Sequence, residues 1–272
     1  MNRRRGIRDG WIRSSALLGV FLLGGCVEIR MPDPDVRYVA FGDSATAGGN
    51  GRAYPEMLRE MLGEPEGSFA NEGEGGETTQ EGLVRIQDLL DADLFPNADV
   101  WLYWEGGNDG VGFVREHDPQ LQFSPNAPDY PFASEWSAQL TETRLNIESA
   151  IHMLHEAGKQ VFVATLVPVE SNTVDCPPLA AASLSSQQAD VANDLILQIN
   201  EAIRAAVDRE SAIHVDVAAV GDELRSDPAH YADCNHLSEK GNEIVAAVFL
   251  NAIQLQAQSV PKNGILLPEP RP

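Results

Sequence analysis

The sequence predicts an α/β fold: a three-layer α/β/α sandwich, doubly wound around a five-stranded parallel sheet. Two observations support this prediction. Short runs rich in β-branched and aromatic residues alternate along the chain with longer segments of helical periodicity. These runs are apolar almost throughout, as strands covered on both faces are. A length of 272 residues with 43% hydrophobic residues is sufficient for one large domain with its own core.

The first 35 residues precede this domain. Several arginines lead into an apolar run, residues 16–25, that is too short to cross a bilayer. The sequence Leu-Gly-Gly-Cys at 23–26 resembles the lipobox of bacterial lipoproteins. The resemblance implies a signal peptide over residues 1–25 and diacylation of the Cys26 sulfur after cleavage. The alternative is a plain secretory signal with a chance cysteine. We expect a secreted or periplasmic protein with a short tether at 26–35 and a lipid anchor in the outer membrane or cell surface.

The charge of the chain limits its partners. The signal segment before Cys26 holds five of the 19 basic residues and one of the 41 acidic residues, so the remainder carries a net charge of −26. Such an acidic body repels the phosphate backbone, which argues against nucleic-acid binding. It also repels anionic membrane surfaces, so contact with a membrane requires a separate anchor.

The first half of the domain contains three of the expected strands and two helices. Gly42 and the Asp43–Ser44 pair end the first strand, and the glycine-dense stretch 71–77 follows the second. Thr78 with Glu81 matches a capping box that opens a helix. We expect strands at 36–42, 68–71 and 100–104, and helices at 54–62 and 78–90.

The second half begins with an expected long loop, residues 110–133, that contains several prolines. Ser134 is expected to cap a helix with one broad apolar face that ends at Gly158. Two strands follow, at 161–167 and 213–217, separated by a helix with apolar residues at helical spacing. A last helix spans about 238–257. The domain is expected to cover residues 36–258, followed by a proline-rich tail at 259–272.

Four polar blocks follow the expected strands and would meet at one edge of a parallel sheet. Taken alone, Ser44 is equally consistent with a helix cap. Together the blocks offer the parts that acyl transfer needs: Ser44 as nucleophile, His236 as base and Asp233 to orient the base. The backbone N–H groups of Ser44 and Gly76 and the Asn108 amide could form the oxyanion hole.

These blocks resemble those of the SGNH (GDSL) hydrolase family. The matching residues are FGDSATAGG at 41–49, Asn71 with Gly76 and Thr78, GGNDG at 106–110, and Asp233 with His236. The resemblance implies a flavodoxin-like fold, the triad and oxyanion hole named above, and a hydrolase without metal or cofactor. Gly73 is a weaker candidate than Gly76 for the second block. Leu237 departs from the proline that the family often has after the histidine.

We therefore predict a secreted serine esterase, most simply a monomer, that hydrolyses short acyl or acetyl esters of a small molecule or a glycan through an acyl-enzyme. One alternative is an O-acetyltransferase acting on a cell-surface glycan, and another is a surface-binding lipoprotein without activity. The combination of Ser44, Asn108, Asp233 and His236 argues against the last, because binding alone needs no base oriented by a carboxylate.

Other residues have less specific patterns. His152 and His155 are expected on an exposed helix face rather than at a metal site, and His214 is expected to be structural. Aromatic residues of the long loop either line a substrate pocket or anchor the loop; these are Phe113, Phe123, Tyr130 and Phe132.

Two cysteines besides Cys26 remain. In a protein that leaves the reducing cytosol, Cys176 and Cys234 are expected to form a disulfide, since both lie in loops at the same edge of the sheet. The alternative is a pair of free thiols.

Overall fold

The computed structural model describes residues 30–171, 176 and 183–259. The predicted signal peptide, the lipidation site Cys26 and nearly all of the predicted C-terminal tail lie outside these residues. Within the described part of the chain, none of the helices combines the length and the apolar character that crossing a bilayer requires.

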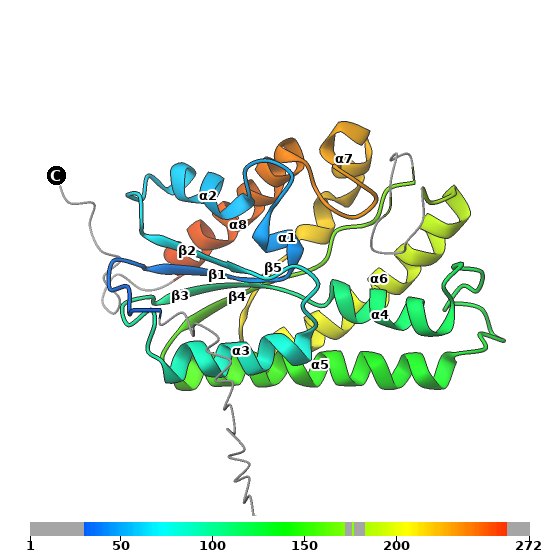
Figure 1. Cartoon of the computed structure of the whole chain (residues 1–272), viewed down its shortest axis with the longest axis horizontal. Coiled ribbons are helices and arrows are strands. Elements are labelled where there is room, and N and C mark those ends of the chain that lie inside the picture. Colours follow the sequence, from blue (N-terminus) through cyan, green and yellow to red (C-terminus); the bar gives the residue numbers. More distant parts are fainter. Residues whose placement is uncertain (1–29, 172–175, 177–182, 260–272) are drawn as a thin grey trace, which may run out of the picture. The chain divides into compact units, whose positions relative to one another are not determined.

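The strands form one parallel sheet in the order β2-β1-β3-β4-β5 (Figure 1). The predicted five-stranded α/β fold is therefore confirmed. β1 and β3 lie inside the sheet, and their residues are buried almost without exception, which explains their continuous apolar sequences. The strands are β1 (Tyr38–Gly42), β2 (Phe69–Gly73), β3 (Val100–Trp104), β4 (Gln160–Ala164) and β5 (Ile213–Val215).

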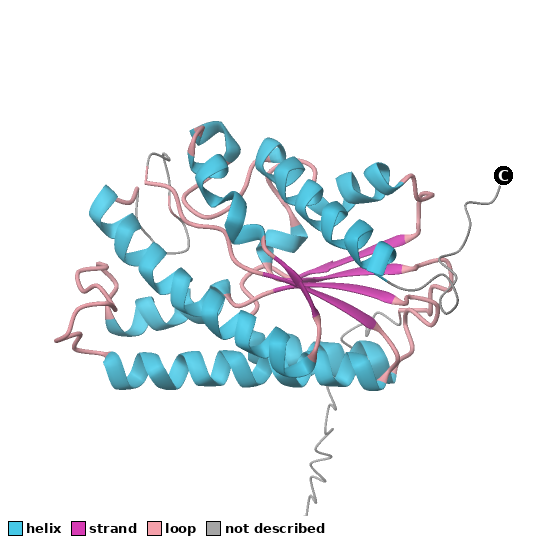
Figure 2. Ribbon diagram, turned by 180° about the vertical axis from the view of Figure 1, so that it is seen from behind, coloured by secondary structure: helices cyan, strands magenta, loops and turns pink. Residues whose placement is uncertain are grey.

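Helices cover both faces of the sheet (Figures 1 and 2). On one face, Tyr54 of α2 and Phe249 of α8 stack with ring centroids 4.7 Å apart, and the ring of Trp104 packs edge-on against Tyr54. On the other face, α5 packs against both α3 and α6. The larger helices are α2 (Tyr54–Leu62), α3 (Thr79–Asp91), α5 (Ala133–Glu156), α6 (Ser186–Glu210) and α8 (Glu239–Ser259).

The helix ends agree with the sequence patterns in part. Thr78 and Glu81 form the predicted capping box of α3. Ser134 is not a cap, because α5 already starts at Ala133 and Phe132 precedes it without a side-chain cap. Gly158, with φ +76°, follows this helix as predicted. A second capping box, Ser185 with Gln188, opens α6 and is not among the predicted helix caps.

The prediction of a loop over all of 110–133 was wrong, because α4 (Gly107–His117) occupies its first third. Its glycines weaken a helix in isolation, but burial of Phe113 and Val114 compensates for them. At Gly110 a Cβ would come 2.8 Å from Ile199 Cδ1, so the glycine allows α4 to approach α6 closely.

The aromatic residues of this region pack on one another instead of lining a pocket. Phe113 contacts the rings of His117 and Trp136, with centroids 4.6 and 4.7 Å away. Phe132 contacts both Phe123 and Tyr130. Of the two interpretations left open by the sequence, anchoring of the loop is the one that these contacts support.

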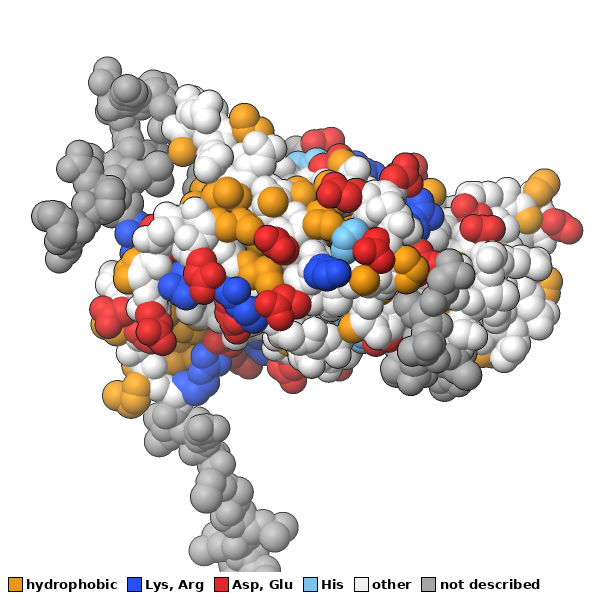
Figure 3. All heavy atoms as spheres, turned by 90° about the horizontal axis from the view of Figure 1, so that it is seen from above, with side chains coloured by type: hydrophobic (Ala, Val, Ile, Leu, Met, Phe, Trp, Pro, Cys, Tyr) orange, Lys and Arg blue, Asp and Glu red, His pale blue; other side chains and the backbone are white. Residues whose placement is uncertain are grey.

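Charged side chains are dispersed over one face of the protein. On the face that Figure 3 shows, acidic side chains lie scattered among basic and apolar ones. Exposed ion pairs such as Arg52–Glu60 at 2.7 Å and Arg225–Asp222 at 2.8 Å each contribute little to stability. Such ion pairs therefore offset little of the repulsion among the excess acidic residues.

Candidate active site

Ser44 is placed by the end of β1. A Cβ on Gly42 would come 2.2 Å from the Trp104 carbonyl oxygen, so only glycine fits where the chain leaves the sheet. Asp43 then caps the single-turn helix α1 (Ser44–Ala47), and its Oδ1 accepts a hydrogen bond from Ala45 N at 2.8 Å. Because Asp43 is the cap, the Ser44 hydroxyl is left available to other partners.

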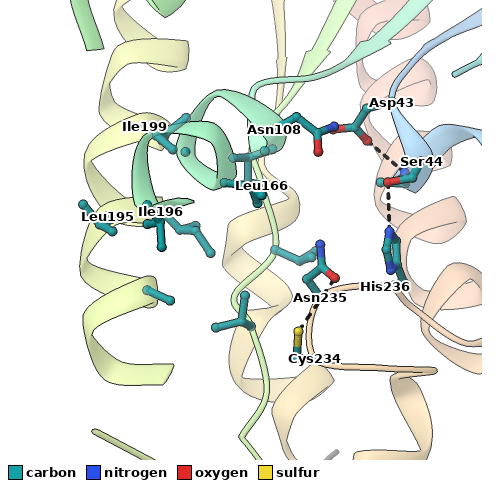
Figure 4. Close-up of a pocket in the computed structure, with 18 of the residues that line it drawn as sticks. Asp43, Ser44, Asn108, Leu166, Leu195, Ile196, Ile199, Cys234, Asn235 and His236 are labelled. Carbon is teal, nitrogen blue, oxygen red and sulfur yellow. Dashed lines mark hydrogen bonds between the residues drawn. The ribbon is translucent and has the colours of Figure 1, made fainter. Parts of the chain in front are cut away.

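His236 and Asp233 lie in the loop that precedes α8. Asp233 Oδ1 accepts hydrogen bonds from the backbone N–H groups of Asn235 and His236, at 3.0 and 2.8 Å. Asp233 Oδ2 lies 2.7 Å from His236 Nδ1. His236 Nε2 lies 2.9 Å from Ser44 Oγ, as Figure 4 shows. The structure thus brings the three residues together in the predicted order.

The tautomer of His236 follows from its partners. A carboxylate only accepts, so Nδ1 carries the proton and Nε2 accepts from the Ser44 hydroxyl. The hydrogen bond to Asp233 raises the pKa of His236, although burial opposes it. Burial alone would raise the pKa of Asp233, but its hydrogen bonds from His236 and from the backbone of Asn235 lower it instead. The pair therefore stabilises an imidazolium beside an ionised carboxylate, so His236 becomes a neutral base at a higher pH than a free histidine does.

Two backbone N–H groups, that of Ser44 itself and that of Gly76, are the candidate oxyanion donors. Within the described residues, neither the Ser44 N–H nor the Gly76 N–H has a hydrogen-bond acceptor. The glycine-rich segment passes Ser44 closely: a Cβ on Gly75 would lie 3.9 Å from Ser44 Cβ. Gly73, the competing candidate, has a packing role, since its Cβ would come 2.0 Å from Ala47 N. Gly76 is thus better placed than Gly73 to donate to a ligand.

The Asn108 amide lies on the same side of the site. Its Nδ2 donates to the Glu77 carbonyl at 2.9 Å and to Asp43 Oδ2 at 3.3 Å. The second contact is long, so it is the one that a stronger acceptor could replace. Burial raises the pKa of Asp43 to about 6.

Cys176 and Cys234 form a disulfide in the structure, with Cα atoms 5.0 Å apart. Cys234 lies between Asp233 and His236, and its carbonyl accepts from Glu170 N at 2.8 Å. The Tyr231 hydroxyl donates to the Pro168 carbonyl at 2.8 Å. These contacts attach the histidine loop to the segment that follows β4.

An apolar cavity of about 110 Å³ opens beside Ser44 and His236. Its wall comprises Val111 and Val114 of α4, Leu166 after β4, and Leu195, Ile196 and Ile199 of α6 (Figure 4).

The segment after β4 is held in place as a wall of this cavity by two asparagines of α6. Asn200 bonds both backbone groups of Leu166, at 2.7 and 3.0 Å, and Asn193 bonds both backbone groups of Val169, at 2.8 and 3.2 Å. The sequence gives no separate signal for this wall, because the α6 pattern is that of an ordinary core helix.

The other sequence candidates lie outside this site. His152 is exposed and contacts Glu156 and Glu210. His214 is half-buried in β5, where burial lowers its pKa. In the described part of the chain, no three His, Cys, Asp or Glu side chains are grouped to hold a metal ion.

Comparisons with known proteins agree with the motifs. The model of the GDSL-like lipase/acylhydrolase family matches residues 40–244. Curated protein sequences give no match. Among solved structures, a GDSL-like lipase from Bacteroides thetaiotaomicron is 18% identical, with a TM-score of 0.55 over 83% of this chain and 93% of that one. A catalytic mutant of an acetylxylan esterase from Geobacillus stearothermophilus is 19% identical, with a TM-score of 0.54 and coverages of 83% and 96%. A lipase/acylhydrolase from Enterococcus faecalis is 18% identical, with a TM-score of 0.54 and coverages of 84% and 100%. At these identities the solved structures establish the fold only.

Proposed function

Since this chain belongs to the GDSL-like lipase/acylhydrolase family, we propose that it hydrolyses carboxylic esters through an acyl-enzyme formed on Ser44. The observation that carries this proposal is the continuous hydrogen-bonded series from Asp233 through His236 to Ser44, at 2.7 and 2.9 Å. A serine with a base in reach, and a base with an orienting carboxylate, is the arrangement that activates a hydroxyl for attack.

In the first half of the reaction, Ser44 Oγ attacks the ester carbonyl carbon while its proton passes to His236 Nε2. The tetrahedral intermediate collapses when the C–O bond to the alcohol breaks, and His236 returns the proton to the departing oxygen. Water repeats the sequence on the acyl-enzyme, so that the acid leaves and Ser44 regains its proton. Asp233 remains ionised throughout and stabilises the imidazolium.

The negative charge on the tetrahedral oxygen needs donors that are already in place. The N–H groups of Ser44 and Gly76 have no internal acceptor to give up among the described residues. Asn108 contributes through the N–H that faces Asp43 at 3.3 Å, since an oxyanion is a better-placed acceptor for it than the distant carboxylate. This makes Asn108 a donor that acts mainly in the transition state.

The apolar cavity suggests which part of the ester lies where. Its 110 Å³ exceed what an acetyl group needs, and an apolar protein cavity of about 150 Å³ can take up benzene. We assign the cavity to the acyl chain, with a preference for short to medium aliphatic chains over acetyl. Two of the similar solved structures are acetylxylan esterases, so acetylated glycans are the competing substrate class.

The proposal also includes a location for the esterase, which comes from the sequence. A signal peptide over 1–25 and a lipid on Cys26 would keep the esterase at the membrane surface outside the cytosol. Replacing Cys26 by alanine should release the protein from the membrane fraction. A Cys26→Ala variant that stays with membranes would contradict the anchor and leave the esterase assignment untouched.

The decisive test is hydrolysis of aryl esters from acetyl to palmitoyl, beside acetylated xylan, by wild type and by Ser44→Ala. We expect no turnover by the variant, and fluorophosphonate labelling of wild type at Ser44 alone. Ser137→Ala, which alters an exposed serine of α5, is the matched control and should retain full activity. Full turnover by Ser44→Ala would refute the proposal. A preference for acetyl esters would refute the acyl-chain assignment of the cavity.

A further inference from the structure

Glu105 is a buried acid three positions before Asn108 in the chain, and the mechanism above does not use it. It follows β3 and is 1% exposed. Its Oε2 accepts a hydrogen bond from the Tyr103 hydroxyl at 3.1 Å. Its Oε1 is buried, and no donor reaches it from the described residues. An ionised carboxylate is strongly disfavoured in such a place, so Glu105 needs either a cation or a proton.

The nearby cation is already engaged. Arg85 of α3 donates through both Nε and Nη2 to the Glu77 carboxylate, the Nε contact being 2.6 Å long. Further donors of the same guanidinium reach the carbonyl oxygens of Glu72 and Gly42, at 3.0 and 3.4 Å. Arg85 and Glu77 thus form a bidentate ion pair, and the guanidinium has no such contact with Glu105 among the described residues.

The Glu105 side chain contacts the Glu77 carboxylate. Two carboxyl groups can share a hydrogen bond only if one of them carries a proton, and Arg85 already stabilises the charge on Glu77. The proton therefore belongs to Glu105. Burial, followed by the contact with Glu77 and the charges of Glu77 and Asp43, raises the pKa of Glu105 well above its usual range.

Helix α3 is shaped around this carboxyl group. A Cβ on Gly82 would lie 2.5 Å from Glu105 Oε2 and 2.7 Å from Oε1. Glycine destabilises a helix relative to alanine, so its presence in this turn requires a reason. The reason is the space that the carboxyl group of Glu105 occupies.

The Glu105–Glu77 contact joins the two segments that supply oxyanion donors. Glu77 follows Gly76, and its carbonyl accepts from Asn108 Nδ2 at 2.9 Å. Glu105 precedes the turn that carries Asn108. We propose that protonated Glu105 is a positioning residue, whose O–H donates to the Glu77 carboxylate and keeps the Gly76 N–H and the Asn108 amide aimed at the oxyanion. This inference rests on the proposed function.

A consequence for pH follows from the charges that face Glu105. These are the carboxylates of Glu77 and Asp43, the guanidinium of Arg85 that Glu77 already binds, and the Tyr103 hydroxyl. If Glu105 loses its proton, two adjacent carboxylates repel each other and the two donor segments separate. Activity should therefore fall at alkaline pH, above the range in which His236 becomes neutral.

Glu105→Gln and Glu105→Met separate the hydrogen bond from the volume. The glutamine keeps a neutral donor toward Glu77, so kcat at pH 7.5 should stay close to wild type and the alkaline loss should disappear. The methionine has no donor, and misplaced donors should lower kcat by about 10- to 100-fold at nearly constant KM. Glu148→Gln is the matched control, because Glu148 is a buried acid on α5 that pairs with Arg144 and Arg209. It should change neither kcat nor the pH profile.

A measurement that does not depend on turnover tests the proton itself. In NMR spectra of protein labelled at the glutamate carboxyl carbons, the signal that Glu105→Gln removes should be that of a protonated acid at pH 7.5. An ionised Glu105 at this pH overturns the proposal, whatever the activity. Wild-type kcat and pH profile in Glu105→Met overturn the positioning role, while labelling and turnover at Ser44 would still support the esterase. An inactive wild type would instead refute the proposed function and leave the NMR result to decide the state of Glu105.

Discussion

Removing the Cys176–Cys234 disulfide should destabilise the protein strongly and impair the histidine loop. The bridge links residues 58 positions apart. In the chain-entropy model, a loop of this length corresponds to about 4 kcal/mol of unfolding free energy at 25 °C. For a domain of this size, that loss lowers the melting temperature by about 8–16 °C. The double variant Cys176→Ser, Cys234→Ser should show the shift in urea and thermal unfolding, and reduced wild type should match it.

The same change should affect catalysis, because Cys234 lies between Asp233 and His236. Looser placement of the base should lower kcat by up to about 10²-fold, while a fluorophosphonate still labels Ser44 slowly. If the double variant loses less than about 1 kcal/mol of unfolding free energy, the predicted role of the disulfide is wrong, since the contacts of Glu170 and Tyr231 would then suffice to hold the loop. Alkylation of both cysteines without reductant in protein from an oxidising compartment would show that the bridge does not form.

Four further predictions follow from the site and the charge. Because Asp233 raises the pKa of His236 and only the neutral imidazole is a base, kcat/KM should rise with pH with a midpoint above about 6.5, and a flat profile from pH 5 to 8 would contradict this. Asn108→Ala should lower kcat by about 10²–10³ with little change in KM, whereas an effect on KM alone would mean that Asn108 binds the ground state. Burial raises the pKa of Asp43 to about 6, so the folded state binds the proton more tightly and stability declines as pH rises from about 4 to 6. Asp43→Asn should therefore gain about 1–3 kcal/mol at pH 7.5 and nothing at pH 4 in urea unfolding, and an equal effect at both pH values would argue against the raised pKa. The net charge of −26 on residues 26–272 should make the melting temperature higher in 1 M NaCl than in low salt, and an unchanged value would exclude charge repulsion as a significant cost to stability.

The strands and the polar blocks could be predicted because each signal is local. The continuous apolar run of β3 is typical of a strand covered on both faces, and the glycines and polar residues that follow it mark the end of the strand. Ser44 and His236, by contrast, are 192 residues apart, and their 2.9 Å contact depends on the order of strands in the sheet. Sequence alone indicated that they could meet, but not at what distance.

The features that could not be predicted from the sequence also have physical causes. α4 contains three glycines, which are strong loop signals, and it forms because α5 and α6 bury its apolar face. Glu105 has no distinguishing pattern in the sequence, because its significance depends on Glu77 and Gly82 from another part of the chain. The cavity wall could not be recognised in the sequence, because Leu195 and Ile199 have the same spacing as core residues.

The backbone anchoring of the segment after β4 bears on how this protein can diverge. Asn200 and Asn193 form hydrogen bonds with the main chain of Leu166 and Val169. These bonds do not depend on which side chains the segment carries. Residues 166, 167 and 169 all line the cavity. New side chains there can reshape the cavity while the strand, the histidine loop and Ser44 keep their places. Selection, natural or in the laboratory, can thus alter the accepted acid at these positions without rebuilding the groups that carry out the reaction.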